Sequence, residues 1–218
     1  MIISPGRRFI FVHIPKTGGT AMALALENRA MKDDILIGDT PKAVKRRQRL
    51  RGVQTAGRLW KHSTLADIDG LLGADQLDDF LIFTLVRNPW DRMVSYYHWL
   101  RAQDFDHPAV GLARRLEFGD FVQHPQTQAS VRAAPYGHYL CDGLGRERAA
   151  LFIRLEHLAQ DIAPLEAHLG FALDEVPRAN TSEREADYRS YYTENTAKIV
   201  AELCAEDIAR FGYVFRAG

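Results

Sequence analysis

Six residues near the N-terminus have types and spacing that suit the binding of a phosphate or sulfate group. The segment Pro15–Thr20 reads Pro-Lys-Thr-Gly-Gly-Thr and joins an apolar run, Phe9–Ile14, to an Ala- and Leu-rich stretch, Ala21–Met31. Glycines let a backbone curl until several N–H groups point at one spot, and the N-terminus of a following helix favours an anion. Lys16 adds a mobile positive charge, and two threonines add hydroxyl donors. Taken alone, the six residues also fit an ordinary turn between a strand and a helix.

A second segment repeats this arrangement. Arg87 follows the apolar run Asp79–Val86, and Ser95 lies about two turns into a helix predicted to reach Gln103. A guanidinium at the C-terminal edge of a parallel sheet, with a hydroxyl nearby, suits a second oxyanion. The alternative is an ion pair between Arg87 and Asp91, with Ser95 facing solvent.

The order of residues differs from that of a Walker A loop, in which the lysine follows the glycines. Here Lys16 precedes Gly18 and Gly19, and Val86 is followed by an arginine rather than by an acid that could hold magnesium. We therefore expect no metal at this site. Phosphoryl transfer by a nucleotide-dependent kinase is kept as an alternative function.

The elements that must position these residues belong to an α/β fold. Three continuous apolar runs, Phe9–Ile14, Asp79–Val86 and Ala149–Leu155, are typical of strands buried on both faces of a parallel sheet. Helix propensity follows each of them. Residues 104–147 read as short helices and loops. We predict a single domain over residues 1–218, a parallel sheet flanked by helices with a helical insertion at 104–147.

Several helix ends are marked by capping residues. Ser63 or Thr64 could cap a short helix that reaches Leu72. Asn88 is a good N-cap for the helix that reaches Gln103, and Thr193 is predicted to cap the last helix. Another amphipathic helix is predicted over residues 156–169.

Composition narrows the class of protein. The chain has 218 residues, of which 46% are hydrophobic, so a disordered chain is excluded. Lys and Arg number 28, as do Asp and Glu, and this balance disfavours a nucleic-acid binder. Cys141 and Cys204 lack a metal-binding spacing, and no apolar run reaches the ~20 residues of a membrane span. The N-terminus has no signal-peptide core, so we expect a cytoplasmic protein.

The two anion-binding segments together carry a family resemblance. Residues 11–20 resemble the 5′-phosphosulfate loop of sulfotransferases that use 3′-phosphoadenosine 5′-phosphosulfate (PAPS), and residues 85–97 resemble their 3′-phosphate-binding segment. Residues 152–158, 180–182 and 205–215 are similar to the carbohydrate-directed branch, which includes heparan 2-O-sulfating and chondroitin-type enzymes and their bacterial relatives. Residues 104–147 carry the weakest resemblance.

The resemblance implies a fold and a site. The fold is akin to that of the P-loop kinases. The backbone amides of Thr17, Gly18, Gly19 and Thr20 would hold the 5′-phosphosulfate, and Lys16 would neutralise charge as the sulfuryl group departs. Arg87 and Ser95 would bind the 3′-phosphate, and PAPS would be the co-substrate.

His62 resembles the histidine that relatives place between the two segments as a general base. An alcohol is a poor nucleophile, so removal of its proton in the transition state helps transfer, and the ordinary pKa of histidine suits this task. The alternative is a histidine that merely precedes a helix cap. His13, within a strand, reads better as a buried core residue.

Two regions have less certain roles. Asn180 and Ser182, followed by Arg184, would lie near the nucleotide or the acceptor by the resemblance, or would form a plain polar loop. The basic run from Lys42 to Arg51 suits an anionic acceptor, or it is a solvated helix face.

The sequence therefore predicts a PAPS-dependent sulfotransferase that acts on a hydroxyl of an acceptor, a glycan by the resemblance. A catalytically inactive module that binds PAPS or an adenylate is the non-enzyme alternative. A large distance between His62 and Lys16 would favour this inactive module over the enzyme.

Overall fold

The computed structural model describes residues 1–73, 75–173 and 184–215. The chain divides into two compact units, each made of two segments. Unit 1 comprises Met1–Val86 and Tyr136–Asn180, and unit 2 comprises Arg87–Pro135 and Thr181–Gly218. The insertion predicted at 104–147 falls partly in each unit, and the single domain over 1–218 stays a prediction.

Unit 1 is built on a five-stranded sheet in the order β3-β1-β2-β4-β5. The strands are β1 (Ile2–Ser4), β2 (Phe9–Val12), β3 (Ile35–Leu36), β4 (Leu81–Val86) and β5 (Leu151–Arg154). The strands β2, β4 and β5 are parallel, with Phe11 opposite Phe83 and Phe83 opposite Leu151. The three predicted strands and their parallel pairing are confirmed.

The prediction of a purely parallel sheet is wrong at one edge. Strand β1 pairs antiparallel with β2, and β3 pairs antiparallel with β1, so the sheet is mixed. Both edge strands are short, with three and two residues. Such short segments do not produce the long apolar runs by which the central strands were found.

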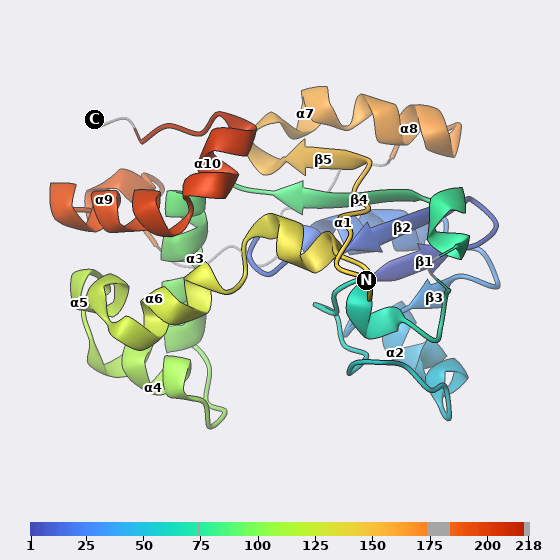
Figure 1. Cartoon of the computed structure of the whole chain (residues 1–218), viewed down its shortest axis with the longest axis horizontal. Coiled ribbons are helices and arrows are strands. Elements are labelled where there is room, and N and C mark those ends of the chain that lie inside the picture. Colours follow the sequence, from blue (N-terminus) through green and yellow to red (C-terminus); the bar gives the residue numbers. More distant parts are fainter. Residues whose placement is uncertain (74, 174–183, 216–218) are drawn as a thin grey trace. The chain divides into compact units, whose positions relative to one another are not determined.

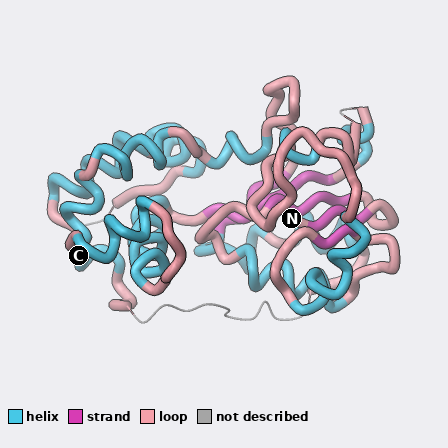
Figure 2. Tube along the Cα trace, turned by 90° about the horizontal axis from the view of Figure 1, so that it is seen from below, coloured by secondary structure: helices cyan, strands magenta, loops and turns pink. Residues whose placement is uncertain are grey.

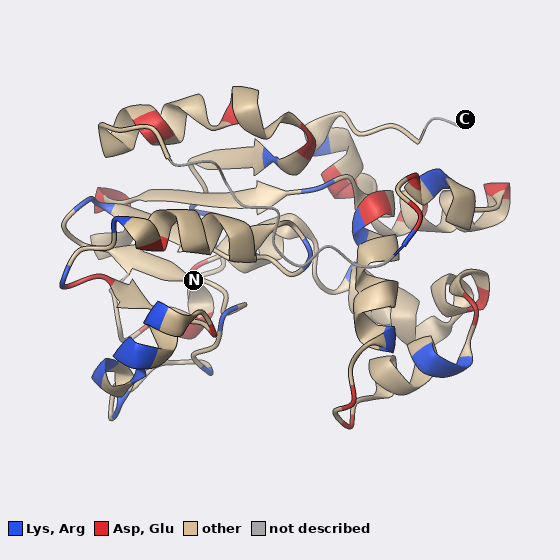
Figure 3. Cartoon of the chain, turned by 180° about the vertical axis from the view of Figure 1, so that it is seen from behind, with Lys and Arg blue, Asp and Glu red and all other residues tan. Residues whose placement is uncertain are grey.

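Helices cover the sheet of unit 1. Helix α1 (Gly19–Asn28) lies across one face, as Figure 3 shows, and its Met22 and Leu26 pack with Phe11 and Phe83. The other helices are α2 (Pro41–Arg46), α7 (Leu158–Asp161) and α8 (Ala163–Leu169). In Figure 1, α7 and α8 run along β5. The described residues of unit 1 also form five 3₁₀ turns: η1 (Arg47–Leu50), η2 (Ala66–Ile68), η3 (Gln76–Asp79), η4 (Tyr136–Leu140) and η5 (Leu155–His157).

The described residues of unit 2 form helices and turns and no strand, as Figure 2 shows by its colours. The helices are α3 (Pro89–Arg101), α4 (Pro108–Arg115), α5 (Phe118–Gln123), α6 (Pro125–Arg132), α9 (Glu194–Leu203) and α10 (Ala205–Phe211), with the turn η6 (Tyr188–Tyr191). Helix α3 supplies the centre of the core through Trp90, Val94 and Tyr97, which are at most 3% exposed. The Trp90 Nε1–H group donates to the Ala197 carbonyl at 2.9 Å, which fixes α9 against α3.

Some predicted helix ends are confirmed. Asn88 caps α3 by accepting from the Trp90 N–H, and Thr193 caps α9 within a capping box. The last helix is interrupted at Cys204, and α10 then ends at Gly212 in the left-handed region. The helix predicted over 156–169 is likewise divided into η5, α7 and α8.

The helix predicted from Ser63 or Thr64 to Leu72 is wrong. Only the short turn η2 forms, after Thr64 and Asp67 exchange hydrogen bonds between their backbone N–H groups and side chains. Ser63 is fully buried, and its hydroxyl donates to the Arg58 and Trp60 carbonyls instead of capping a helix.

Candidate functional site

The loop Pro15–Thr20 connects the end of β2 to the start of α1 with two residues in the left-handed region. Lys16 has φ 67° and Gly18 has φ 85°. A lysine in this conformation is uncommon, and such strain collects at sites where a loop must present its backbone to a ligand. The Ala21 and Met22 N–H groups donate to the Gly18 carbonyl, so the Gly19 and Thr20 N–H groups lie in the first turn of the helix, where N–H groups have no partner within the helix. Binding of an anion by this loop stays a prediction.

Internal contacts fix the shape of the loop. Thr17 is fully buried, and its hydroxyl donates to the Ile14 carbonyl at 2.9 Å. Thr17 can therefore offer a ligand its backbone N–H but not its hydroxyl proton. A Cβ atom at Gly18 would lie 2.9 Å from the Leu155 side chain, so the residue after β5 closes over the loop.

Gly19 is required by a close approach of His13. A Cβ atom at Gly19 would lie 2.0 Å from Cδ2 and 2.4 Å from Nε2 of His13. The His13 side chain is buried, and burial, followed by the charge of His62, holds its pKa well below the ordinary range. His13 is thus a neutral core residue that supports the start of α1, as the sequence indicated.

The structure places His62 beside His13, two residues before this loop. Its Nδ1 atom lies 2.8 Å from the His13 carbonyl oxygen, and the two imidazole rings are 4.6 Å apart. A carbonyl oxygen can only accept, so Nδ1 carries the proton and Nε2 keeps its lone pair. The backbone just after β2 therefore selects the tautomer that a general base at Nε2 needs.

The surroundings of His62 change its protonation. Burial lowers its pKa to about 4, although the hydrogen bond to the His13 carbonyl acts in the opposite direction. The expectation of an ordinary histidine pKa at this position is wrong because the ring is enclosed by Trp60 and His13. At neutral pH the ring is therefore neutral, with its Nε2 lone pair unprotonated.

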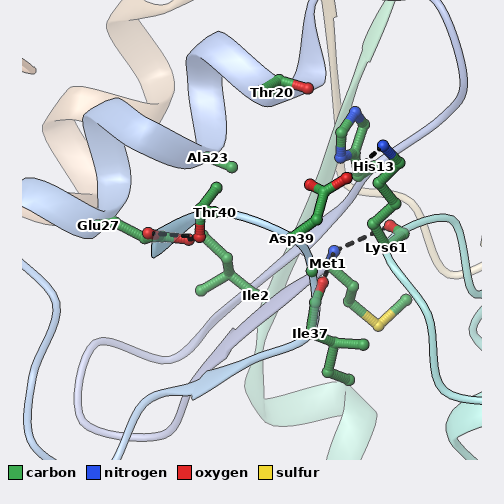
Figure 4. A pocket seen from close by; sticks show the side chains of 11 residues that line it. Met1, Ile2, His13, Thr20, Ala23, Glu27, Ile37, Asp39, Thr40 and Lys61 are labelled. Atoms are coloured by element: carbon green, nitrogen blue, oxygen red, sulfur yellow. Dashed lines mark hydrogen bonds and ion pairs between the residues drawn. The ribbon is translucent and has the colours of Figure 1, made fainter. Parts of the chain in front are cut away.

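A small pocket lies against the same part of unit 1. Asp39 and Lys61 point toward one another beside His13, with Nζ and Oδ2 2.6 Å apart (Figure 4). Farther along α1, the buried Glu27 carboxylate accepts from the Thr40 hydroxyl at 2.7 Å. The pocket is lined by Met1, Ile2, His13, Thr20, Ala23, Glu27, Ile37, Gly38, Asp39, Thr40 and Lys61.

In unit 2, Arg87 is held by a carboxylate. Its Nε and Nη2 atoms lie 2.8 and 2.7 Å from Oδ2 of Asp91. The ion pair considered as the alternative for Arg87 is therefore present. Ser95 does not face solvent, however, since it is only 7% exposed.

Arg184 joins this group, which the sequence did not reveal. Its Nη2 atom donates to Oδ1 of Asp91 at 2.7 Å, so one carboxylate holds two guanidinium groups. Its Nη1 atom is buried and has no hydrogen-bond partner among the described residues. Arg184 and Asp91 are 93 positions apart, so no local spacing could have paired them. The group carries one positive charge in excess, which suits an anion.

The remaining predictions from the sequence concern Asn180 and Ser182, the basic run, membrane helices and metal sites. Asn180 and Ser182 lie outside the described residues. Part of the basic run is structural, since Lys42, Arg46 and Arg49 donate to backbone carbonyls at the end of α1 or just beyond it. Within the described ranges, no helix has the length and hydropathy to cross a bilayer. No group of three His, Cys, Asp or Glu residues suited to a metal ion occurs in that same part of the chain.

Comparisons with known proteins place the chain among relatives. No curated protein sequence matches it. Among solved structures, a mouse sulfotransferase, SULT7A1, complexed with PAP shares 17% sequence identity with a TM-score of 0.48, over 94% of this chain and 85% of that one. The model of the sulfotransferase family matches residues 1–214. The chain therefore belongs to the sulfotransferase family.

Proposed function

We propose that the protein transfers the sulfuryl group of PAPS to a hydroxyl of a carbohydrate acceptor. The observation that carries this proposal is the location of His62, whose Nδ1 atom is bound to the carbonyl of His13, two residues before the anion loop begins. The proposal is supported because one unit holds both a loop suited to an anion and a histidine whose Nε2 lone pair could take the proton of an alcohol. A module that only binds nucleotide would have no need for this arrangement.

In the proposed reaction, the acceptor oxygen forms a bond to sulfur while the bond from sulfur to the 5′-phosphate oxygen breaks. His62 Nε2 takes the proton of the hydroxyl, and 3′,5′-adenosine bisphosphate leaves. Negative charge builds on the bridging oxygen, and Lys16 neutralises it. The backbone N–H groups of Thr17–Thr20, aligned at the start of α1, bind the phosphosulfate oxygens.

Arg87 and Ser95 take the 3′-phosphate in this proposal. Arg87 is oriented by Asp91, and Ser95 lies on the helix that begins directly after it. A guanidinium offers paired N–H groups that match the oxygens of a phosphate. Asn180 and Ser182 are proposed to line the nucleotide or the acceptor.

A carbohydrate acceptor is supported by the resemblance of residues 152–158 and 205–215 to the carbohydrate-directed branch. The same resemblance supports a P-loop-kinase-like core made by β2, the anion loop and α1. No metal has a role in the proposed mechanism, because Lys16 and the backbone amides balance the charge of the donor.

The deciding experiment is a screen of acceptors with PAPS labelled in its sulfate group, read as label transferred to the acceptor. Transfer should persist in excess EDTA. Nucleotide binding without transfer to any acceptor would favour the inactive module. Transfer of labelled phosphate from ATP, lost in EDTA and restored by magnesium, would replace the proposal with the kinase alternative.

A further inference from the structure

Two buried polar atoms of unit 2 have no hydrogen-bond partner among the described residues. They are Nη1 of Arg184 and Nε2 of His98. A buried polar atom without a partner costs free energy, so such positions in proteins are usually bound by water or by a ligand. The reaction proposed above uses neither atom, and both are polar groups that a ligand could bind.

Helix α3 brings His98 onto the face that carries the proposed phosphate ligand Ser95. Asp91, Ser95 and His98 are spaced four and then three residues apart, so they follow one another along one face of the helix. His98 is therefore about one turn beyond Ser95, on the side that is proposed to receive the 3′-phosphate.

Arg184 lies against the same face of α3. Its Nη2 atom donates to Oδ1 of Asp91 at 2.7 Å, and Nη1 belongs to the same planar guanidinium, so this contact also fixes where Nη1 lies. The charge of Arg184 acts on the His98 imidazole, which shows that the two side chains are close to one another. The two atoms without partners thus belong to one cluster rather than to separate places.

The surroundings of His98 disfavour a positive charge on its ring. Burial holds the pKa of His98 below its ordinary value, and the charges of Arg184 and then Arg101 act in the same direction. The remaining titratable neighbours are Tyr191 on η6 and Tyr97 on α3, whose rings lie 5.1 and 5.4 Å from the imidazole. In the protein without ligand, His98 is therefore neutral at neutral pH.

From these observations we propose that His98 is a further ligand of the 3′-phosphate and takes up a proton when a 3′-phosphorylated nucleotide binds. This inference deepens the proposed function and rests on it. The phosphate has three acceptor oxygens and carries up to two negative charges. One oxygen would accept from Nη1 of Arg184, and another would accept from protonated Nε2 of His98. The proton comes from solvent, and no covalent bond changes.

The sign of the local charge explains why proton uptake should depend on the ligand. Without the phosphate, two guanidinium groups repel a positive charge on His98. A bound phosphate reverses the sign of the field, and a negative charge within hydrogen-bond distance raises the pKa of a histidine. Because the complex would then hold one more proton than the free protein, affinity for the nucleotide should fall as pH rises.

The first test is calorimetry of the whole chain with 3′,5′-adenosine bisphosphate and with AMP, in Tris and in PIPES at about pH 7. The two buffers have different enthalpies of ionisation, so the difference in heat reports the protons taken up. We expect about half a proton or more for the bisphosphate and clearly less for AMP. AMP carries the same 5′-phosphate, so it corrects for protons taken up elsewhere. Equal uptake with both nucleotides would overturn the proposal.

Matched variants locate the proton. His98→Gln should remove the extra uptake and lower affinity for the bisphosphate by about 10-fold, with less than about twofold change for AMP. The 3′-phosphate itself titrates near pH ~6, and this contribution remains in the variant, so the difference from wild type isolates His98. His107→Gln, at an exposed histidine of unit 2, is the control and should leave the uptake unchanged. Wild-type uptake in His98→Gln would reject the assignment.

A measurement on the wild type avoids any defect in folding of the variant. The NMR signal of the His98 ring, assigned through its contact with Tyr191, is followed against pH without nucleotide, with AMP and with the bisphosphate. Only the bisphosphate should raise the pKa of His98, by about one unit or more. Wild-type protein that prefers the bisphosphate to AMP without this rise would refute the role of His98 alone. Equal affinity for both nucleotides would refute the 3′-phosphate site of the proposed function as well.

Discussion

The two segments of this chain that are proposed to bind anions are built by different means. In unit 1, the loop Pro15–Thr20 acts through its backbone, with Lys16 and Gly18 in the left-handed region and the Thr17 hydroxyl bound inside. In unit 2, the segment acts through side chains, with Arg87 and Arg184 both bound to Asp91. One site depends on the path of the chain, and the other depends on which side chains are present.

The difference has a consequence for binding. A backbone site is formed before the ligand arrives, because its N–H groups are fixed by the fold. The Arg87 guanidinium is already bound to the Asp91 carboxylate. An incoming phosphate must therefore share this guanidinium with Asp91 or displace Asp91 from it. Substitution of a glycine should therefore disturb the loop in unit 1. Removal of a single guanidinium should disturb anion binding in unit 2.

The largest effect is expected on turnover, when the proposed base in unit 1 is removed. His62→Ala should lower turnover by ~10²–10⁴ and leave affinity for 3′,5′-adenosine bisphosphate nearly unchanged, because a general base acts on the acceptor. Lys16→Ala should lower both quantities, since Lys16 touches the donor before and during the reaction. Steady-state kinetics and calorimetry measure the two effects. Near-wild-type turnover in His62→Ala would leave the base unassigned.

The side-chain site should show the next largest effect. Arg87→Ala should cost ~2–5 kcal/mol in binding of 3′,5′-adenosine bisphosphate, or roughly 30- to 5,000-fold in affinity. The loss for AMP should be small, because AMP lacks the 3′-phosphate. Calorimetry with both nucleotides, with the exposed Arg114→Ala as the control, measures the contrast. Equal affinity of the wild type for both nucleotides would remove Arg87 from the 3′-phosphate site.

The backbone site should respond to a single methyl group. Gly19→Ala should destabilise the fold by ~1–3 kcal/mol, because the added Cβ would lie 2.0 Å from His13. Gly119→Ala is the matched control, since its Cβ would meet only Thr196 at an ordinary 3.9 Å. Urea unfolding of the two variants measures the difference. Equal stability in both would mean that the start of α1 can move away from His13.

The smallest expected effect concerns pH. Because the pKa of His62 is about 4, its base form is already complete above about pH 6. The kcat/KM value should therefore change less than about twofold between pH 6 and 8 on account of His62, and it should fall as pH drops through 4. A rising limb centred at pH 6–7 that disappears in His62→Ala would show an ordinary pKa.

Much of the central part of the fold could be predicted from the sequence. The buried strands β2, β4 and β5 were visible as apolar runs, and Asn88 and Thr193 marked helix starts. These features are local, so periodicity and capping chemistry predict them. The short edge strands β1 and β3 were not visible, because their pairing depends on neighbours rather than on their own composition.

The site was predictable in part for the same reason. The loop Pro15–Thr20 is continuous in sequence, so its residue types alone predicted a tight turn between β2 and α1. The contact between His62 and the His13 carbonyl, and that between Arg184 and Asp91, join residues 49 and 93 positions apart. Both the tautomer and the low pKa of His62 follow from such distant contacts, which no local pattern encodes.

The hydrogen bond from Trp90 to Ala197 has a consequence for synthesis on the ribosome. These residues are 107 positions apart, so α3 is made long before α9 can cover it. At ~5–20 residues per second, the face carrying Trp90 would wait about 5–20 seconds for its partner. During that interval the nascent chain presents the apolar face of α3 to solvent or to a chaperone. Slow translation between the two helices should therefore raise the yield of aggregated chains.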